Sequence, residues 1–143
     1  MNSVDSTTVL NGLIAMHNRT LPMYLANATR AWYSENDTHA REVLDAIAAD
    51  QQATVERLGQ LVMREGRPVE MGGFPIQFTS LHDLSLDYLI KKSIELQQRD
   101  ISLIETAIHF LEDGSDEQAL GEEALGAAKG HLESLNELSL NNT

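Results

Sequence analysis

Apolar residues recur at alternating spacings of four and three residues along four long stretches of this chain. Such spacing keeps one face of an α-helix apolar, so it predicts four long helices that pack together by that face. The predicted helices cover residues 6–33, 38–65, 80–113 and 115–140. Pro22 lies inside the first of them, where we expect it to kink the helix near Asn18 without ending it, because the apolar stripe continues beyond it.

Each apolar stripe is interrupted near its midpoint by a polar side chain. The interrupting residues, one on each predicted helix, are His17, Gln51, Gln97 and His131. Buried polar groups need hydrogen-bond partners, and neutral imidazoles and amides can satisfy one another. The pattern therefore predicts a polar layer halfway along the bundle, in which the histidines bond to the glutamines.

The longest segment that is predicted to be non-helical is 67–79, which contains two prolines and two glycines together with several apolar residues. We expect it to lie against the helices. About 14 extended residues reach roughly 45 Å, whereas a helix of about 28 residues is roughly 42 Å long. The segment can therefore return along the whole bundle, which makes the second and third helices parallel. Short turns connect the other pairs, which would be antiparallel within a single domain, residues 1–143.

An all-α, up-down-down-up bundle with a long crossover between helices 2 and 3 resembles the ferritin-like superfamily over nearly the whole chain. Members with a di-iron site carry a Glu on each of two helices and Glu-x-x-His on each of the other two. Carried over, the single glutamates fall near His17 and Gln97, and the two Glu-x-x-His motifs fall on 51–54 and 128–131. Of the six ligands that the family uses, this chain retains His131.

A pair of iron ions needs carboxylate oxygens to offset its charge, and the predicted polar layer supplies none. Asp50 and Glu95 lie close to the layer in sequence, so a rotated or kinked helix could bring them to His17 and His131. These four residues form the candidate metal site, either for iron or, through the histidines and Asp50, for zinc or copper. The resemblance otherwise implies a protein with no cofactor and a degenerate metal site.

The acidic composition restricts the possible partners. The chain has 22 Asp and Glu against 10 Lys and Arg, so we expect no binding to nucleic acid or to an acidic membrane surface. It contains no cysteine, which excludes disulfides and thiolate chemistry. No apolar run approaches the roughly 20 residues that span a bilayer, and the first residues do not look like a signal peptide. We therefore expect a cytoplasmic protein.

No residue is predicted to be catalytic. Ser93 and Thr54 lie near the level of the polar layer, but no Ser-His-Asp spacing accompanies them. The first function prediction is a non-enzymatic ferritin-like protein that acts in binding or assembly. The alternatives are a metal-binding member for iron oxidation or storage, and a small-molecule binder. Four aromatic residues predict a homodimer or higher homo-oligomer, namely Trp32, Tyr33, Phe74 and Phe78.

Overall fold

The computed structural model describes residues 5–27, 38–72 and 86–141. Within these ranges the chain forms five helices and no strand, so the prediction of an all-α fold is confirmed for them. The helices are α1 (Ser6–Asn18), α2 (Leu21–Asn27), α3 (Thr38–Arg64), α4 (Leu86–Ile108) and α5 (Asp116–Asn141). None of these helices is long and apolar enough to cross a membrane.

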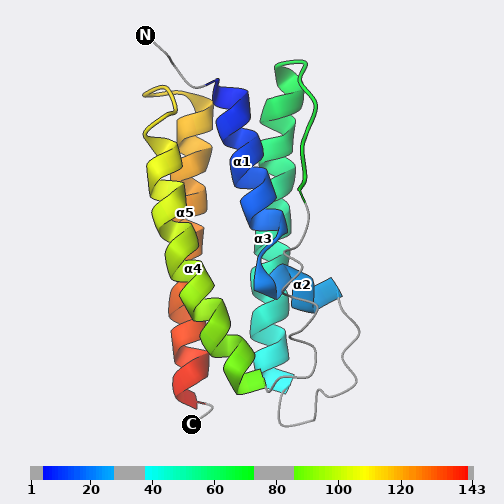
Figure 1. Ribbon diagram of the computed structural model, residues 1–143, viewed down its shortest axis with the longest axis vertical. Coiled ribbons are helices and arrows are strands. Elements are labelled where there is room, and N and C mark those ends of the chain that lie inside the picture. The colour runs from blue at the N-terminus through cyan, green and yellow to red at the C-terminus, as the bar shows by residue number, and fades with distance from the viewer. Residues whose placement is uncertain (1–4, 28–37, 73–85, 142–143) are drawn as a thin grey trace.

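The long helices lie side by side along the longest axis of the molecule, whereas α2 turns away from it (Figure 1). In this view the chain descends through α1, ascends through α3 and again through α4, and descends through α5. Among the long helices, the main packing contacts pair α1 with α3, α4 with α5, and α3 with α5, and the short α2 packs on α3. Consequently α3 and α4 point in the same direction, while each lies against antiparallel neighbours.

The prediction that the first helix continues through Pro22 is wrong. Helix α1 ends at Asn18, and α2 begins at Leu21. Thr20 caps the new helix, because its Oγ1 accepts a hydrogen bond from the Met23 N–H at 3.3 Å. Pro22 therefore lies in a first helical turn, where the missing N–H of proline costs nothing. Residues 28–33 of the predicted helix lie outside the described residues, as do Trp32, Tyr33, Phe74 and Phe78.

Two other helix boundaries follow from local chemistry. Helix α3 ends at Arg64, and Gly66 follows with φ 71°, a left-handed conformation that glycine adopts readily. Gly114 is the predicted end of the third helix, but the corresponding helix, α4, ends at Ile108. Tight turns follow, including a hydrogen bond from the Leu111 N–H to the Ile108 oxygen at 3.0 Å, and they keep the Leu111 side chain buried.

Residues 67–72 form a strap that lies against α1, as expected for the start of the crossover. The Asn11 side chain donates to the Pro68 oxygen (3.2 Å) and accepts from the Glu70 N–H (2.9 Å). At the last residue of α1, the Asn18 Nδ2 donates to the Met71 oxygen at 3.2 Å. The strap descends from the end of α3 (Figure 1), and these hydrogen bonds hold it to α1. The remainder of the crossover, with the predicted cap Ser80, lies outside the described residues.

The apolar core consists of two clusters, one on each side of the predicted polar layer. One cluster joins α1, α3, α4 and α5, and includes Leu13, Leu58 and Ile104. The other joins α2, α3, α4 and α5, and includes Leu25 and Leu44. Along α3, α4 and α5, the core residues before the polar position belong to one cluster and those after it belong to the other, while α1 and α2 divide in the same way on either side of His17. The polar layer therefore lies between two apolar clusters.

Candidate functional site

All four residues of the polar layer are buried, although they are polar: His17, Gln51, Gln97 and His131. They line one small cavity at mid-height, which we call the central cavity. Its other polar lining residues are Thr20, Thr54 and Asp100, and its apolar lining residues are Met16, Ile104, Ala124, Ala127 and Ala128. The space open to the centre of a water molecule is about 10 Å³, which is close to the minimum for a single water.

His17 is held in one tautomer by its own helix. Its Nδ1 lies 2.7 Å from the Leu13 carbonyl oxygen, and because a carbonyl oxygen can only accept, Nδ1 must carry the proton. Burial lowers the pKa of His17 below its ordinary value of 6.5; the Leu13 bond opposes this shift, and the nearby His131 adds to it. The ring is therefore neutral at pH 7 and has an unprotonated Nε2.

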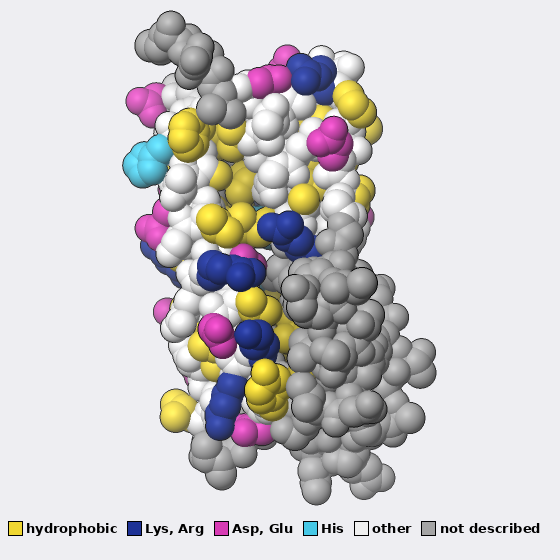
Figure 2. Space-filling view, viewed as in Figure 1, with side chains coloured by type: hydrophobic (Ala, Val, Ile, Leu, Met, Phe, Trp, Pro, Cys, Tyr) yellow, Lys and Arg dark blue, Asp and Glu magenta, His cyan; other side chains and the backbone are white. Residues whose placement is uncertain are grey.

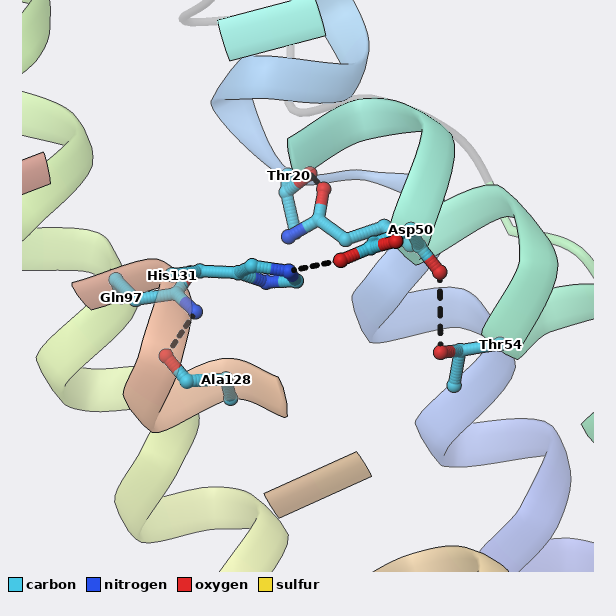
Figure 3. Close-up of polar contacts among 7 residues, drawn as sticks. Thr20, Asp50, Thr54, Gln97, Ala128 and His131 are labelled. Carbon is cyan, nitrogen blue, oxygen red and sulfur yellow. Dashed lines mark hydrogen bonds and ion pairs between the residues drawn. The ribbon is translucent and has the colours of Figure 1, made fainter. Parts of the chain in front are cut away.

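The two glutamines each bond to a partner outside the polar layer. Gln97 Nε2 donates to the Ala128 oxygen on α5 at 3.0 Å (Figure 3). Gln51 Oε1 accepts from the Thr20 hydroxyl at 2.6 Å. The prediction that histidines and glutamines bond to one another is therefore wrong for the described contacts. Backbone carbonyls lie closer to these side chains, and the break before α2 frees the Thr20 hydroxyl.

Within the polar layer, His131 links α5 to α3. Its Nε2 lies 3.0 Å from Asp50 Oδ2, and Figure 3 shows the two side chains reaching toward each other from their helices. The His131 side chain is only 11% exposed, whereas that of Asp50 is 70% exposed. Asp50 therefore approaches the buried imidazole from the solvent side. A carboxylate can only accept, so we assign the shared proton to Nε2.

The remaining candidate ligand lies elsewhere. The Glu95 side chain is 71% exposed and pairs with Lys92 Nζ at 3.7 Å. Of the four candidate metal ligands, the structure thus brings His131 and Asp50 together and places His17 on the same cavity. Across the described residues, no group of three or more His, Asp and Glu side chains is placed to hold a metal ion. This arrangement does not fit a di-iron centre, which requires several carboxylates.

Asp100 is a lining residue that sequence reasoning missed. Burial raises the pKa of its carboxyl from 3.8 to about 6, and the charges of Arg99 and Arg19 oppose that rise. Asp100 lies three residues after Gln97, a spacing that places both side chains on one face of a helix. That spacing was the available signal, but the predicted stripe continued through the neighbouring Ile101.

The hydroxyls near this level do not complete a catalytic arrangement. Ser93 is buried, but its Oγ has no hydrogen-bond partner and it does not line the central cavity. Thr54 lines the cavity, and its hydroxyl donates to the Asp50 backbone oxygen at 3.1 Å. Nucleophilic catalysis requires a hydroxyl bonded to the imidazole base, and no such bond joins His17 or His131 to a hydroxyl in the described part of the chain.

Comparison with models of known protein families, with curated proteins and with solved structures found no match. The resemblance to the ferritin-like superfamily accordingly rests on the directions of the helices, on the crossover and on the position of the polar layer.

Proposed function

We propose that this protein is a ferritin-like four-helix bundle that acts in binding or assembly and not as an enzyme. In it, a hydrogen-bonded polar layer takes the place of the di-iron site. The directions of α1, α3, α4 and α5 support the up-down-down-up topology, as does the strap that starts back along α1 (Figure 1). The short α2 is then the continuation of the first bundle helix after its break.

One observation carries this proposal. The resemblance assigns the di-iron ligands to six positions, and the residues at all six line the central cavity: His17, Gln51, Thr54, Gln97, Ala128 and His131. These positions are spread over four helices, α1, α3, α4 and α5. Their convergence supports a ferritin-like arrangement of the bundle.

The same positions argue against iron chemistry. They carry two imidazoles and no carboxylate, so nothing there offsets the charge of two iron ions. Asp100 is the carboxyl that reaches the cavity from α4, and burial raises its pKa to about 6. A single carboxyl at the cavity supplies much less negative charge than the four glutamates that hold two iron ions in the family.

Metal analysis tests the functional part of the proposal. The untagged protein would be purified from cells grown in iron-rich medium, then incubated with Fe²⁺ or Zn²⁺, desalted, and measured by inductively coupled plasma mass spectrometry. We expect far less than one metal ion per chain in every sample. Two irons per chain, or one zinc that disappears in both His17→Gln and His131→Gln, would establish the metal-binding alternative instead.

A variant with restored ligands tests the structural part separately. It combines H17E, Q51E, T54H, Q97E and A128E, and together with His131 it supplies the full ligand set of the family. If the topology is ferritin-like, this variant should bind iron where the unaltered protein does not. A matched variant, in which the same substitutions are made one turn away on each helix, should remain without iron. Equal uptake by the two variants would contradict the assigned register.

A further inference from the structure

Three side chains of the central cavity use one polar atom in a hydrogen bond and keep a second polar atom for another partner: His17, Gln97 and His131. His17 donates through Nδ1, which leaves Nε2 as an acceptor. Gln97 donates through Nε2, which leaves Oε1 as an acceptor. In its neutral form, His131 donates to Asp50 through Nε2 and keeps Nδ1 as an acceptor.

The central cavity has fewer unused hydrogen-bond donors than unused acceptors. Gln51 uses Oε1 to accept from Thr20, so its amide NH₂ is left. Asp100 adds a carboxylate, which accepts through both oxygens and carries a negative charge. The cavity is therefore rich in acceptors. Arg19 and Arg99 influence Asp100, but both are exposed side chains, and solvent screens their charges.

The size of the cavity limits the guest to about one non-hydrogen atom. A divalent metal ion of that size lacks its ligands here, as the absence of a three-ligand group among the described residues indicates. Water offers two donors and adds two acceptors. An ammonium ion offers N–H donors in every direction, no acceptor, and a positive charge that complements Asp100.

We propose that the central cavity binds a single ammonium ion, which donates hydrogen bonds to His17 Nε2, Gln97 Oε1 and the Asp100 carboxylate. The inference rests on the proposed function, because it requires the polar layer to hold no metal ion. Under the proposed function, ammonium is then the ligand that the protein binds between its four helices. Ammonium would also stabilise the ionised form of Asp100, whose charge burial otherwise disfavours.

Thermal unfolding in matched salts tests the proposal. At pH 7.5 and constant ionic strength, ammonium chloride should raise the Tm above its value in sodium or potassium chloride, with a saturable dependence on concentration. Asp100→Asn should abolish the difference between the salts. Glu105→Gln removes an exposed carboxylate from the same helix and should leave the difference intact.

One further measurement, which needs no substitution, covers a failure of Asp100→Asn to fold. In the unaltered protein, NMR of the Asp100 carboxyl carbon should show a lower pKa in ammonium chloride than in sodium chloride.

Three results would overturn the proposal. They are equal Tm values in all three salts, an equal response to potassium, which has no N–H to donate, and an ammonium effect that survives Asp100→Asn. Metal found in the purified protein would instead reject the proposed function, so mass spectrometry separates that failure from a failure of ammonium binding.

Discussion

At the scale of single residues, Asp100 has a titration whose effect on stability can be derived. Its carboxyl binds a proton more tightly in the folded chain, with a pKa of about 6, than at its ordinary value of 3.8. The folded state therefore holds an extra proton between these values, and stability falls as the pH rises through this interval. The stabilising contribution of this extra proton is complete below pH 3.8, and it is lost above about pH 6.

Asp100→Asn should remove this loss of folding stability at high pH, because an amide does not ionise. In ammonium-free buffer at pH 7.5, we expect the variant to be more stable than the unaltered protein by about 1 kcal/mol, a figure reduced from the full shift because the side chain is partly exposed. The advantage should shrink to nothing near pH 4. Urea unfolding at a series of pH values measures it, and Asp45→Asn, at an exposed position, serves as the control. A constant difference at all pH values would contradict the assignment to Asp100 ionisation.

The positions of the polar layer could be predicted from the sequence, but its bonds could not. His17 and Gln97 interrupt apolar stripes, and that pattern alone places them inside. Their partners are the backbone oxygens of Leu13 and Ala128, which every helix presents and no pattern distinguishes. Asp50 was a candidate because of its place beside Gln51. That it reaches His131 from the exposed side depends on how α3 and α5 are rotated.

At the scale of the elements, the break between α1 and α2 shows where periodicity misleads. The sequence Thr20-Leu21-Pro22 contains a helix start signal, a capping residue followed by a proline in the first turn. The apolar stripe continues through Leu21 into α2 because both segments bury apolar residues, although in different clusters. A continuous stripe therefore predicts burial correctly without requiring a continuous helix.

Helix α5 contains glycines that its packing does not require. Gly126 and Gly130 are exposed, and an added Cβ at either position would meet nothing within 4 Å. Glycine within a helix is less favourable than alanine by about 1 kcal/mol, so Gly126→Ala and Gly130→Ala should each stabilise the protein by about that amount. Urea unfolding of each variant measures the change.

Gly121 on the same helix provides the matched control. A Cβ there would lie 3.1 Å from Ile108 Cγ1, so Gly121→Ala must displace a buried side chain and should gain nothing or destabilise the protein. If all three substitutions stabilised the protein equally, the packing of α5 against the end of α4 would be looser than described.

At the scale of the whole molecule, net charge sets the response to salt. The sequence carries a formal net charge of −12, and repulsion among like charges destabilises a compact chain. Basic and acidic side chains lie beside one another on the face shown in Figure 2, and exposed pairs such as Arg57 with Glu123 join neighbouring helices. Exposed ion pairs contribute little, so the net repulsion should dominate.

Raising sodium chloride from 20 to 500 mM, concentrations that span weak to strong screening, should therefore increase stability by about 1 kcal/mol, or the Tm by about 2–4 °C. Differential scanning calorimetry in sodium chloride measures this without the added effect of strongly excluded salts. A Tm that falls with salt would mean that the cross-helix ion pairs outweigh the repulsion.

The strap has a consequence for how this sequence can change over time. Asn11 holds the peptide groups on either side of Val69 much as a neighbouring parallel strand would, and Gly72, at φ 67°, lies so close to Ala15 that an added Cβ would be 3.0 Å from it. Two fixed points thus set the number of residues between them. In diverged copies of this gene, insertions and deletions should accumulate outside positions 68–72 and be absent within them.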